Sequence, residues 1–579
     1  MLTGLNGCGN TSAEEENVVQ AQEKTERAGT VAEKAETAEE PLRDNDEVYA
    51  NDNETSVVTM YLTVRTGNEA DNTNHTWTEI NSHDVYYYED NNLERYNCEA
   101  LLQVGDEGGP AEGEVGYGET ASNATVQIRG QTSSRSDQKN YKIRIKDGMG
   151  EWRGQRTIAL NKHTGDPYRF RNKLAYDLMK DIPQMMSART QFVHLYVKDE
   201  TEGGNGSFVD YGLYTQVEQI NKTYLKNHGL DNKGSLYKIN FFEWIHYDAL
   251  KLKTDEEYDE TAFEEYLEIK GNDDHTKLLE AIDKIADYSI PIEDIVDENF
   301  DIENICYWMA FHILMGNYDV GSRNYYIYSP QNSERWYFLS WDNDASFSRN
   351  YYRQIQYTEG QSWEQGLTQF MHISLFNRIF RKAEYREMLT NAVEDLRANY
   401  LTQERVSGMA LEYANVVRPY IYRMPDLEHI QLENQNEYDS LVMALSGEIE
   451  ENYGYYLTSL EKPWPFFVGV PVVENGRMSV QWDVSYDLDG EEIRYNFILA
   501  KDIALTDVVY KEDNLFLPEA SFATLSPGVY YMRVQATNAS GYTQDCFDYI
   551  SLESGGKAYG IKAFVVNADG SITEYVNEE

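Results

Sequence analysis

Hydrophobic and polar residues alternate in several short segments of the first half of the chain, beginning after residue 55. A period of two is typical of strands that bury one face. Such strands are predicted at residues 57–64, 124–129, 141–146, 191–197 and 211–217. Between them, Phe170, Leu174 and Leu178 recur at intervals of four within residues 168–180, which predicts a helix.

The pattern then changes twice. Residues 254–315 and 383–460 follow the helical period, whereas residues 478–482, 495–499 and 525–536 alternate again. Strands followed by helices indicate an α+β body with two lobes. We therefore expect an α+β body over residues 55–460 and an all-β sandwich over residues 461–579.

The last of these strands resembles the penultimate strand of fibronectin type III domains. In such domains an aromatic residue after a glycine turn, here the turn at Gly528, closes a tyrosine corner, and a strand tryptophan, here Trp482, fills the core. The resemblance implies a fibronectin type III-like sandwich. A spacer without a binding site is the alternative reading, because sandwich modules host many unrelated functions.

The N-terminal residues 1–8 resemble the end of a bacterial lipoprotein signal, in which the cysteine of Leu5-Asn6-Gly7-Cys8 becomes acylated. The apolar segment that precedes such a cysteine is missing and Asn6 is unusual, so a trimmed signal and a chance match both stay open. Residues 9–54 predict an acidic, disordered tether. We expect an extracytoplasmic protein, lipid-anchored through Cys8 at the bacterial cell surface. The chain contains no run of about 18 consecutive apolar residues, so no transmembrane helix is predicted.

The charge balance limits the classes of molecule that the protein is expected to bind. The chain has 99 acidic and 50 basic side chains and a net charge of -49. Such an excess repels nucleic acid and anionic lipid, so neither is an expected partner, whereas a basic protein segment is. Four cysteines, spaced widely, do not form a disulfide framework, and Cys306 in an apolar run predicts a buried thiol.

The candidate chemistry lies around one predicted hairpin. Asp319 and Asn324 precede its first strand, residues 325–328, and Asp342 and Asp344 follow its second, residues 336–340. A hairpin brings its two ends together, so Asp319, Asn324 and Asp342 should converge. Hard divalent cations bind oxygen ligands, and phosphoryl transfer also needs a carboxylate that orients the attacking hydroxyl. Asp319 and Asn324 stand 5 positions apart, the spacing of base and metal ligand in the protein-kinase catalytic loop.

These residues resemble the catalytic and metal-binding segment of the CotH (spore coat protein H) kinases. The resemblance extends over roughly residues 55 to 450. It is carried by Asp319…Asn324…Trp341-Asp342-Asn343-Asp344, by Arg129-Gly130-Gln131-Thr132-Ser133-Ser134 with Tyr141-Lys142-Ile143, by Asp166…Arg171-Asn172-Lys173-Leu174-Ala175, and by Tyr211-Gly212-Leu213-Tyr214-Thr215-Gln216-Val217-Glu218.

The resemblance implies a divergent, two-lobed protein-kinase-like fold and ATP-dependent phosphorylation of protein hydroxyls, on Ser or Thr, outside the cytoplasm. It implies Mg²⁺ or Mn²⁺ as cofactor, Asp319 as catalytic base, and Asp342 with Asn324 as metal ligands, assisted by Asp344. The protein substrate would be basic and rich in Ser and Thr. Neither H-R-D nor D-F-G occurs, and position 343 is Asn, so regulation through a mobile Phe is not implied.

The same resemblance implies nucleotide contacts, each with a simpler alternative. Lys142, beside the Arg129 loop, would reach the ATP phosphates, although a strand lysine can simply face solvent. Glu218 would lie at the hinge and nucleotide edge, or be a solvated strand end. Trp336 would stack on adenine, or fill the core between the lobes.

Two other function classes stay open. A glycoside hydrolase also uses two carboxylates, and Asp342 and Asp344 on alternate strand positions would lie at about 7 Å from each other. Asn324 and Lys142 have no role in that chemistry. A non-catalytic surface adhesin with a kinase-like body is the second alternative. Binding of ATP with Mg²⁺ or Mn²⁺ separates the hydrolase from the other two.

Overall fold

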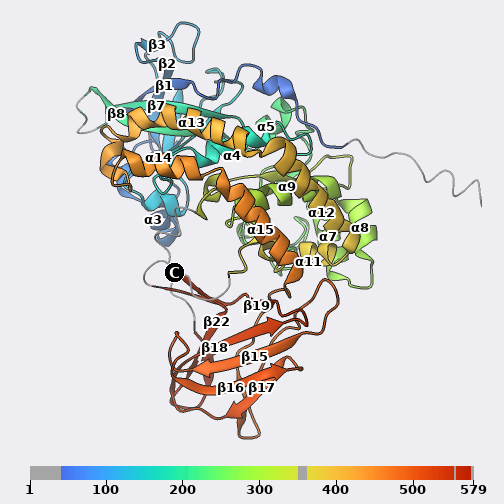
Figure 1. Cartoon of the computed structure of the whole chain (residues 1–579). Coiled ribbons are helices and arrows are strands. Elements are labelled where there is room, and N and C mark those ends of the chain that lie inside the picture. The colour runs from blue at the N-terminus through green and yellow to red at the C-terminus, as the bar shows by residue number, and fades with distance from the viewer. Residues whose placement is uncertain (1–40, 202–203, 205, 350–361, 553–555, 576–579) are drawn as a thin grey trace, which may run out of the picture. The chain divides into compact units, whose positions relative to one another are not determined.

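The computed structural model describes residues 41–579 except 202–203, 205, 350–361, 553–555 and 576–579 (Figure 1). The chain divides into two units, residues 1–42 and residues 43–579, and the second unit is described here. The proposed anchor Cys8 and the tether up to residue 40 lie outside the described residues.

The first large element of the body is a sheet whose strand order closes on itself. Its order is β1-β7-β8-β6-β5-β4-β2-β3, and β1 also pairs with β2. Apart from the parallel pair β1–β7, the neighbours are antiparallel. The strands are β1 (Val57–Arg65), β2 (Cys98–Asp106), β3 (Gly109–Pro110), β4 (Ala124–Arg129), β5 (Asn140–Ile145), β6 (Thr157–Asn161), β7 (Thr190–Asp199) and β8 (Phe208–Glu218).

Alternation of side chains gives this closed sheet an apolar interior and an apolar outer patch. Val193 and Leu195 of β7 join the interior core, whereas Phe192 of the same strand joins the core of the helices. The helices α4 (Arg171–Met179) and α13 (Gln403–Ile421) pack on the outside, against β7 and β8 respectively. Both faces of β7 are therefore buried.

A second, smaller sheet lies among the helices of the body. It is antiparallel, in the order β10 (Leu267–Ile269), β9 (Ser235–Ile239), β11 (Tyr325–Ser329) and β12 (Tyr337–Ser340). The helix α9 (Ile302–Met315) packs against β12 and is buried nearly all round, as its apolar sequence predicts. It ends at Gly316, whose left-handed conformation (φ 60°) turns the chain into the loop of Asp319.

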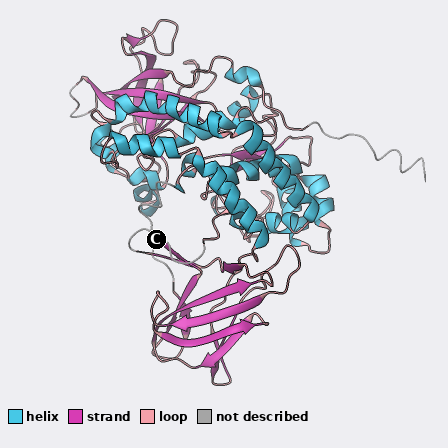
Figure 2. Ribbon diagram, viewed as in Figure 1, coloured by secondary structure: helices cyan, strands magenta, loops and turns pink. Residues whose placement is uncertain are grey.

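The remaining helices of the body surround α9 and the second sheet or cover the closed sheet. They are α2 (Trp77–Ser82), α3 (Val85–Asp90), α5 (Lys222–Asn227), α6 (Glu260–Glu264), α7 (Thr276–Ala286), α8 (Ile292–Asn299), α11 (Ser374–Phe380), α12 (Ala383–Asp395), α14 (Gln435–Ala444) and α15 (Gly447–Glu461). Sheet precedes helix along the chain, so the predicted α+β class is confirmed (Figure 2). Strand β10 lies inside a region predicted as helical.

The body begins earlier than its predicted boundary at residue 55. The hydroxyl of Tyr49 donates a hydrogen bond to the carbonyl of Ser187 at 2.8 Å. Asp44 lies 2.6 Å from His228, and Glu54 pairs with Lys180. The described end of the predicted tether is thus packed on the body, because buried polar partners offset the cost of ordering it.

The C-terminal region is all-β, as predicted (Figure 2). Its described strands form a three-stranded antiparallel sheet, a six-stranded sheet built around β15 and β18, and the two-stranded pair β20–β21. The strands are β13 (Val472–Glu474), β14 (Arg477–Gln481), β15 (Arg494–Ala500), β16 (Val508–Leu515), β17 (Glu519–Ala523), β18 (Gly528–Thr537), β19 (Thr543–Asp545), β20 (Tyr549–Ser551), β21 (Lys557–Tyr559), β22 (Ile561–Val566) and β23 (Ile572–Glu574). Trp482 is buried in its core, and the Tyr530 hydroxyl donates to the carbonyl of Ser526 at 2.9 Å. These are the core tryptophan and the tyrosine corner that the sequence indicated.

Two further predictions concern the cysteines and membrane-spanning helices. Cys98, Cys306 and Cys546 are free and buried, and burial raises the pKa of the Cys306 thiol, as expected of an inert side chain. Within the described residues, no helix has both the length and the apolar character that spanning a bilayer requires.

Candidate active site

The β11–β12 hairpin brings the predicted polar residues to one end. Tyr325 pairs with Ser340 at that end, so Asn324 and Asp342 lie just beyond the paired strands. The Trp341 amide donates to the carbonyl of Asn324 at 3.3 Å and closes the end. Asn324 (φ 61°) and Asp342 (φ 54°) both adopt the left-handed conformation, which Asn and Asp tolerate better than most residues. Backbone strain of this kind concentrates at functional sites.

Asp319 is fixed by its neighbours in the loop. The Asn324 side-chain amide donates to the Asp319 carbonyl at 2.8 Å and to its Oδ2 at 2.9 Å, and Arg323 forms an ion pair with Oδ1. Burial raises the pKa of Asp319, the Arg323 guanidinium opposes this, and the charge of Asp344 adds to it. The result is an oriented carboxylate that can accept a proton.

Helix α4 holds the segment that follows β12. The Asp342 amide donates to the Tyr176 hydroxyl at 3.2 Å, and the Asn343 amide donates to Oδ1 of Asn172 at 3.1 Å. Both partners lie on α4. Asn172 therefore links α4 to the segment that follows β12.

The carboxylates at this end repel one another. Burial and the charge of Asp344 raise the pKa of Asp342 to about 8, with a smaller contribution from Asp319 and an opposing one from Arg129. Desolvation also acts on Asp344, but His163, whose Nδ1 lies 3.9 Å from Oδ2, together with Arg171 and a backbone hydrogen bond, lowers the pKa of Asp344. A bound cation would relieve this repulsion.

The donor set suits a hard divalent cation. Between Asp342 and Asp344, the buried side chain of Asn343 has no partner for either of its amide atoms. Among the described residues, no three His, Cys, Asp or Glu side chains are grouped as a complete metal site. Mg²⁺ does not need one, because it is usually held by one or two carboxylates together with substrate phosphates. Asp342, Asp344 and Asn324 therefore fit Mg²⁺ or Mn²⁺ with a bound nucleotide.

A cluster of cations lies on the adjoining strands of the closed sheet. Lys142 of β5 pairs with Gln127 in β4, and in the described part of the chain no carboxylate forms an ion pair with it. Burial, and then repulsion from Arg95, Arg129 and Arg144, lowers the pKa of Lys142 to about 8. Cations that repel one another in this way favour a polyanion such as a triphosphate.

Arg129 connects the cation cluster to the carboxylates. Its guanidinium donates to Oδ1 of Asn161 and acts electrostatically on Asp342. Lys238, on β9, also lowers the pKa of Asp342. Cations and carboxylates therefore share one region, as a metal–phosphate complex requires.

The structure places two of the predicted nucleotide contacts elsewhere. Glu218 is 1% exposed, and its oxygens bind Arg189 at 2.6 and 2.9 Å and His228 at 3.1 Å, which lowers its pKa to about 2 despite burial. Trp336 is fully buried in the core beside Tyr237, at the end of β12 opposite Asp342. Neither Glu218 nor Trp336 is kept as a nucleotide contact, because their surfaces are already covered.

Asp342 and Asp344 do not lie on one strand, as the glycoside hydrolase alternative assumed. Strand β12 ends at Ser340, and residues Asn343–Ala345 form a 3₁₀ turn. Asp342 and Asp344 are therefore not alternate residues of one strand, and the spacing expected for a hydrolytic pair does not apply.

Several contributors to this site were not predicted. His163 has no sequence spacing typical of a metal ligand, and Tyr176 lies within the helix predicted over residues 168–180, to which no site residue was assigned. Lys238 lies on a strand that the alternation did not reveal, since β9 is buried at four of its five residues. For His163, the only available signal was its position directly after strand β6.

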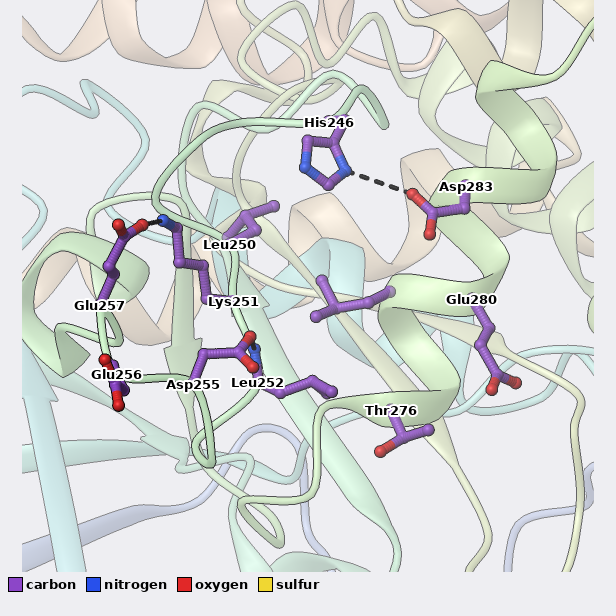
Figure 3. Close-up of a pocket in the computed structure, with 11 residues that line it drawn as sticks. His246, Leu250, Lys251, Leu252, Asp255, Glu256, Glu257, Thr276, Glu280 and Asp283 are labelled. Carbon is purple, nitrogen blue, oxygen red and sulfur yellow. Dashed lines mark hydrogen bonds and ion pairs between the residues drawn. The ribbon is translucent and has the colours of Figure 1, made fainter.

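A pocket of about 620 Å³ lies between residues 246–257 and helix α7 (Figure 3). Its lining combines the apolar side chains of Leu250, Leu252 and Leu279 with a rim of carboxylates, and His246 points to Asp283 at 3.2 Å. The rim carboxylates are Asp255, Glu256, Glu257, Glu280 and Asp283.

The segment 240–257 connects this pocket with the loop of Asp319. The Phe242 amide donates to the carbonyl of Ser322 at 2.8 Å. The guanidinium of Arg323, the partner of Asp319, lies 5.1 Å from the centre of the Phe241 ring. One continuous segment thus contacts the Asp319 loop and lines the acidic pocket.

The family comparison covers the part of the chain whose residues converge here. The chain is 24% identical over 297 residues to the inner spore coat protein H of Bacillus subtilis (strain 168). The aligned region covers 49% of this chain and 74% of that protein. The sequence model described as CotH kinase protein matches residues 126–456, which include Arg129, Lys142, Asp319, Asn324 and Asp342. Because this match spans more than half of the chain, the protein belongs to the CotH kinase family.

Proposed function

We propose that the protein transfers the γ-phosphate of ATP to Ser or Thr hydroxyls of a protein, with Mg²⁺ or Mn²⁺ as cofactor. The observation that carries the proposal is the meeting of the Asp319–Asn324 pair, the Asp342–Asp344 segment and the Lys142 cation cluster around Arg129. Family membership supports the same reaction class.

The chain's own residues divide the work. Asp319, held by Asn324, orients the acceptor hydroxyl and takes its proton as the oxygen attacks the γ-phosphorus, while the bond from the γ-phosphorus to the β–γ bridging oxygen breaks and ADP leaves. Lys142 and Arg129 neutralise the phosphate oxygens and keep the triphosphate in place. Asp342, Asp344 and Asn324 would hold the metal, which supplies charge neutralisation at the β- and γ-phosphates.

The proposal includes the place of action. The lipoprotein-like Leu5–Cys8 supports an anchor at the outer surface of a bacterial membrane, with catalysis outside the cytoplasm. Acylation of Cys8, measured by mass spectrometry of the membrane-associated protein, tests this part by itself. An unmodified Cys8 in the mature protein would reject the anchor and leave the reaction chemistry unaffected.

A direct experiment separates catalysis from binding alone. ATP should raise the thermal midpoint of the full chain only when Mg²⁺ or Mn²⁺ is present, and labelled γ-phosphate should then appear on a basic Ser/Thr-rich acceptor protein. Metal-dependent ATP binding without any phosphate transfer would support the adhesin alternative. Absence of ATP binding would reject both functions.

Replacing Lys142 with methionine should weaken the binding of ATP at least about tenfold. The reason is that Lys142 is a partly buried cation without a carboxylate partner among the described residues, and we expect it to bind the ATP phosphates. The affinity is measured by calorimetry with Mg²⁺ present. Lys511→Met is the matched control, since Lys511 is exposed on β16 and forms an ion pair with Asp513. Equal affinities for wild type and Lys142→Met would remove Lys142 from the phosphate site.

The net charge of -49 and the acidic rim of the pocket favour a basic acceptor. Raising the salt concentration from about 50 to 500 mM should therefore raise the KM for such an acceptor several-fold, since screening shortens the range of the attraction. The KM for ATP should change less. A KM for the acceptor that does not respond to salt would contradict electrostatic recruitment.

A further inference from the structure

The contacts between the C-terminal all-β region and the body include those of two consecutive residues, Trp363 and Glu364. The Trp363 indole donates to the carbonyl of Phe547 at 2.9 Å. The Glu364 carboxylate accepts from Lys557 at 2.6 Å and from the Tyr559 hydroxyl at 2.5 Å. The side chain of Glu364 is only 12% exposed, so its partners come from the protein and are screened less than a surface pair.

Directly after these residues, the short η4 turn (Gly366–Phe370) supports the loop of Asp319. The Gln369 side chain is 3% exposed. Its Nε2 donates to the carbonyl of Asn317 at 2.6 Å and to the carbonyl of Val320 at 3.2 Å. These two carbonyls flank Asp319, so one amide group fixes the backbone on both sides of the candidate base.

His372 makes a second connection between the same parts. Its ring centre lies 5.5 Å from that of Trp363 and 5.8 Å from that of Phe547. On its other side it approaches Gly321, where a Cβ would stand 3.6 Å from Cε1 of His372. The aromatic contacts of the all-β region therefore continue, through His372, to the residue that ends the Asp319 turn.

We propose that the all-β region is a structural part of the phosphate-transfer site and that Gln369 is a positioning residue for Asp319. The inference rests on the proposed function and extends it. Contacts link Phe547, Lys557 and Tyr559 to Trp363 and Glu364. The Thr368 hydroxyl then donates to the Trp363 carbonyl at 2.9 Å, and Gln369 is the next residue of the chain. A module that served only as a spacer would not need to hold the segment that supports the catalytic loop.

Gln369→Met tests the positioning role in the full chain, since it removes the amide donors while nearly keeping the length and volume of the side chain. The rate constant kcat for phosphate transfer should fall at least about tenfold, because small displacements of a catalytic group are costly. ATP affinity and the KM for ATP should stay near their wild-type values. An unchanged kcat would overturn the assignment.

The double variant Lys557→Met, Tyr559→Phe tests the all-β side, because it removes both partners of Glu364. It should lower kcat in the same direction and again spare ATP affinity. Lys511→Met is the control within the same region, since Lys511 and its partner Asp513 are both exposed. If the double variant transfers phosphate like this control, the all-β region does not support the site.

Hydrogen exchange separates this inference from the proposed function, because it needs no activity. Amides of residues 317–324 should exchange about tenfold faster in Gln369→Met and in the double variant, while those of β11 should not. If the wild type transfers no phosphate but exchange rises as expected, the coupling holds and the kinase function fails. Unchanged exchange in both variants rejects the coupling, whatever the activity.

Discussion

Replacement of Asp319 by asparagine is expected to lower phosphate transfer by at least about 100-fold, since general-base assistance and orientation of the acceptor are lost together. ATP affinity should change little, because Asp319 is paired with Asn324 and Arg323 and is not among the proposed metal ligands. Both quantities are measured on one preparation, binding by calorimetry and transfer by phosphate incorporation.

The asparagine side chain is nearly isosteric, so collapse of the loop is not the expected cause of the loss. An equal change in the exposed Asp513, Asp513→Asn, provides the control for removal of one negative charge. Wild-type transfer in Asp319→Asn would exclude Asp319 from the mechanism. Loss of ATP binding together with transfer would instead make Asp319 a metal ligand.

Replacement of Asp342 by asparagine should abolish turnover and reduce the metal-dependent affinity for ATP at least about tenfold, because a neutral amide replaces an anionic oxygen ligand. The affinity for ATP without metal, measured for the variant and the wild type in the presence of a chelator, should change less. The contrast with Asp319→Asn is the informative result, since only one of the two variants should lose nucleotide affinity.

The same control, Asp513→Asn, applies to this variant. A thermal midpoint close to that of the wild type would show that the variant is folded, and we expect one, because the substitution also removes repulsion from Asp344. If ATP with Mn²⁺ binds to Asp342→Asn as tightly as to the wild type, Asp342 is not the ligand. Asp344 would then be the next residue to replace.

The local sequence was enough to predict individual strands and the residues that meet at the end of the β11–β12 hairpin. The strand β4 was predicted at its observed bounds, and Asn324 and Asp342 meet because antiparallel pairing of neighbouring strands is a short-range event. The tyrosine corner at Tyr530 was likewise readable, since its partner Ser526 lies four residues away.

Packing between segments that are distant in sequence decided which partners the predicted residues have. The alternation pattern says which face of a strand is buried but not what covers it, so Glu218 was not predicted to pair with Arg189 and His228. The burial of Trp336 and the contact of Gln369 with the Asp319 loop likewise depend on segments that are distant in sequence. The sequence by itself determined which residues could do the chemistry. The tertiary structure decided which of them share a site, because burial and charge are properties of the whole packed chain.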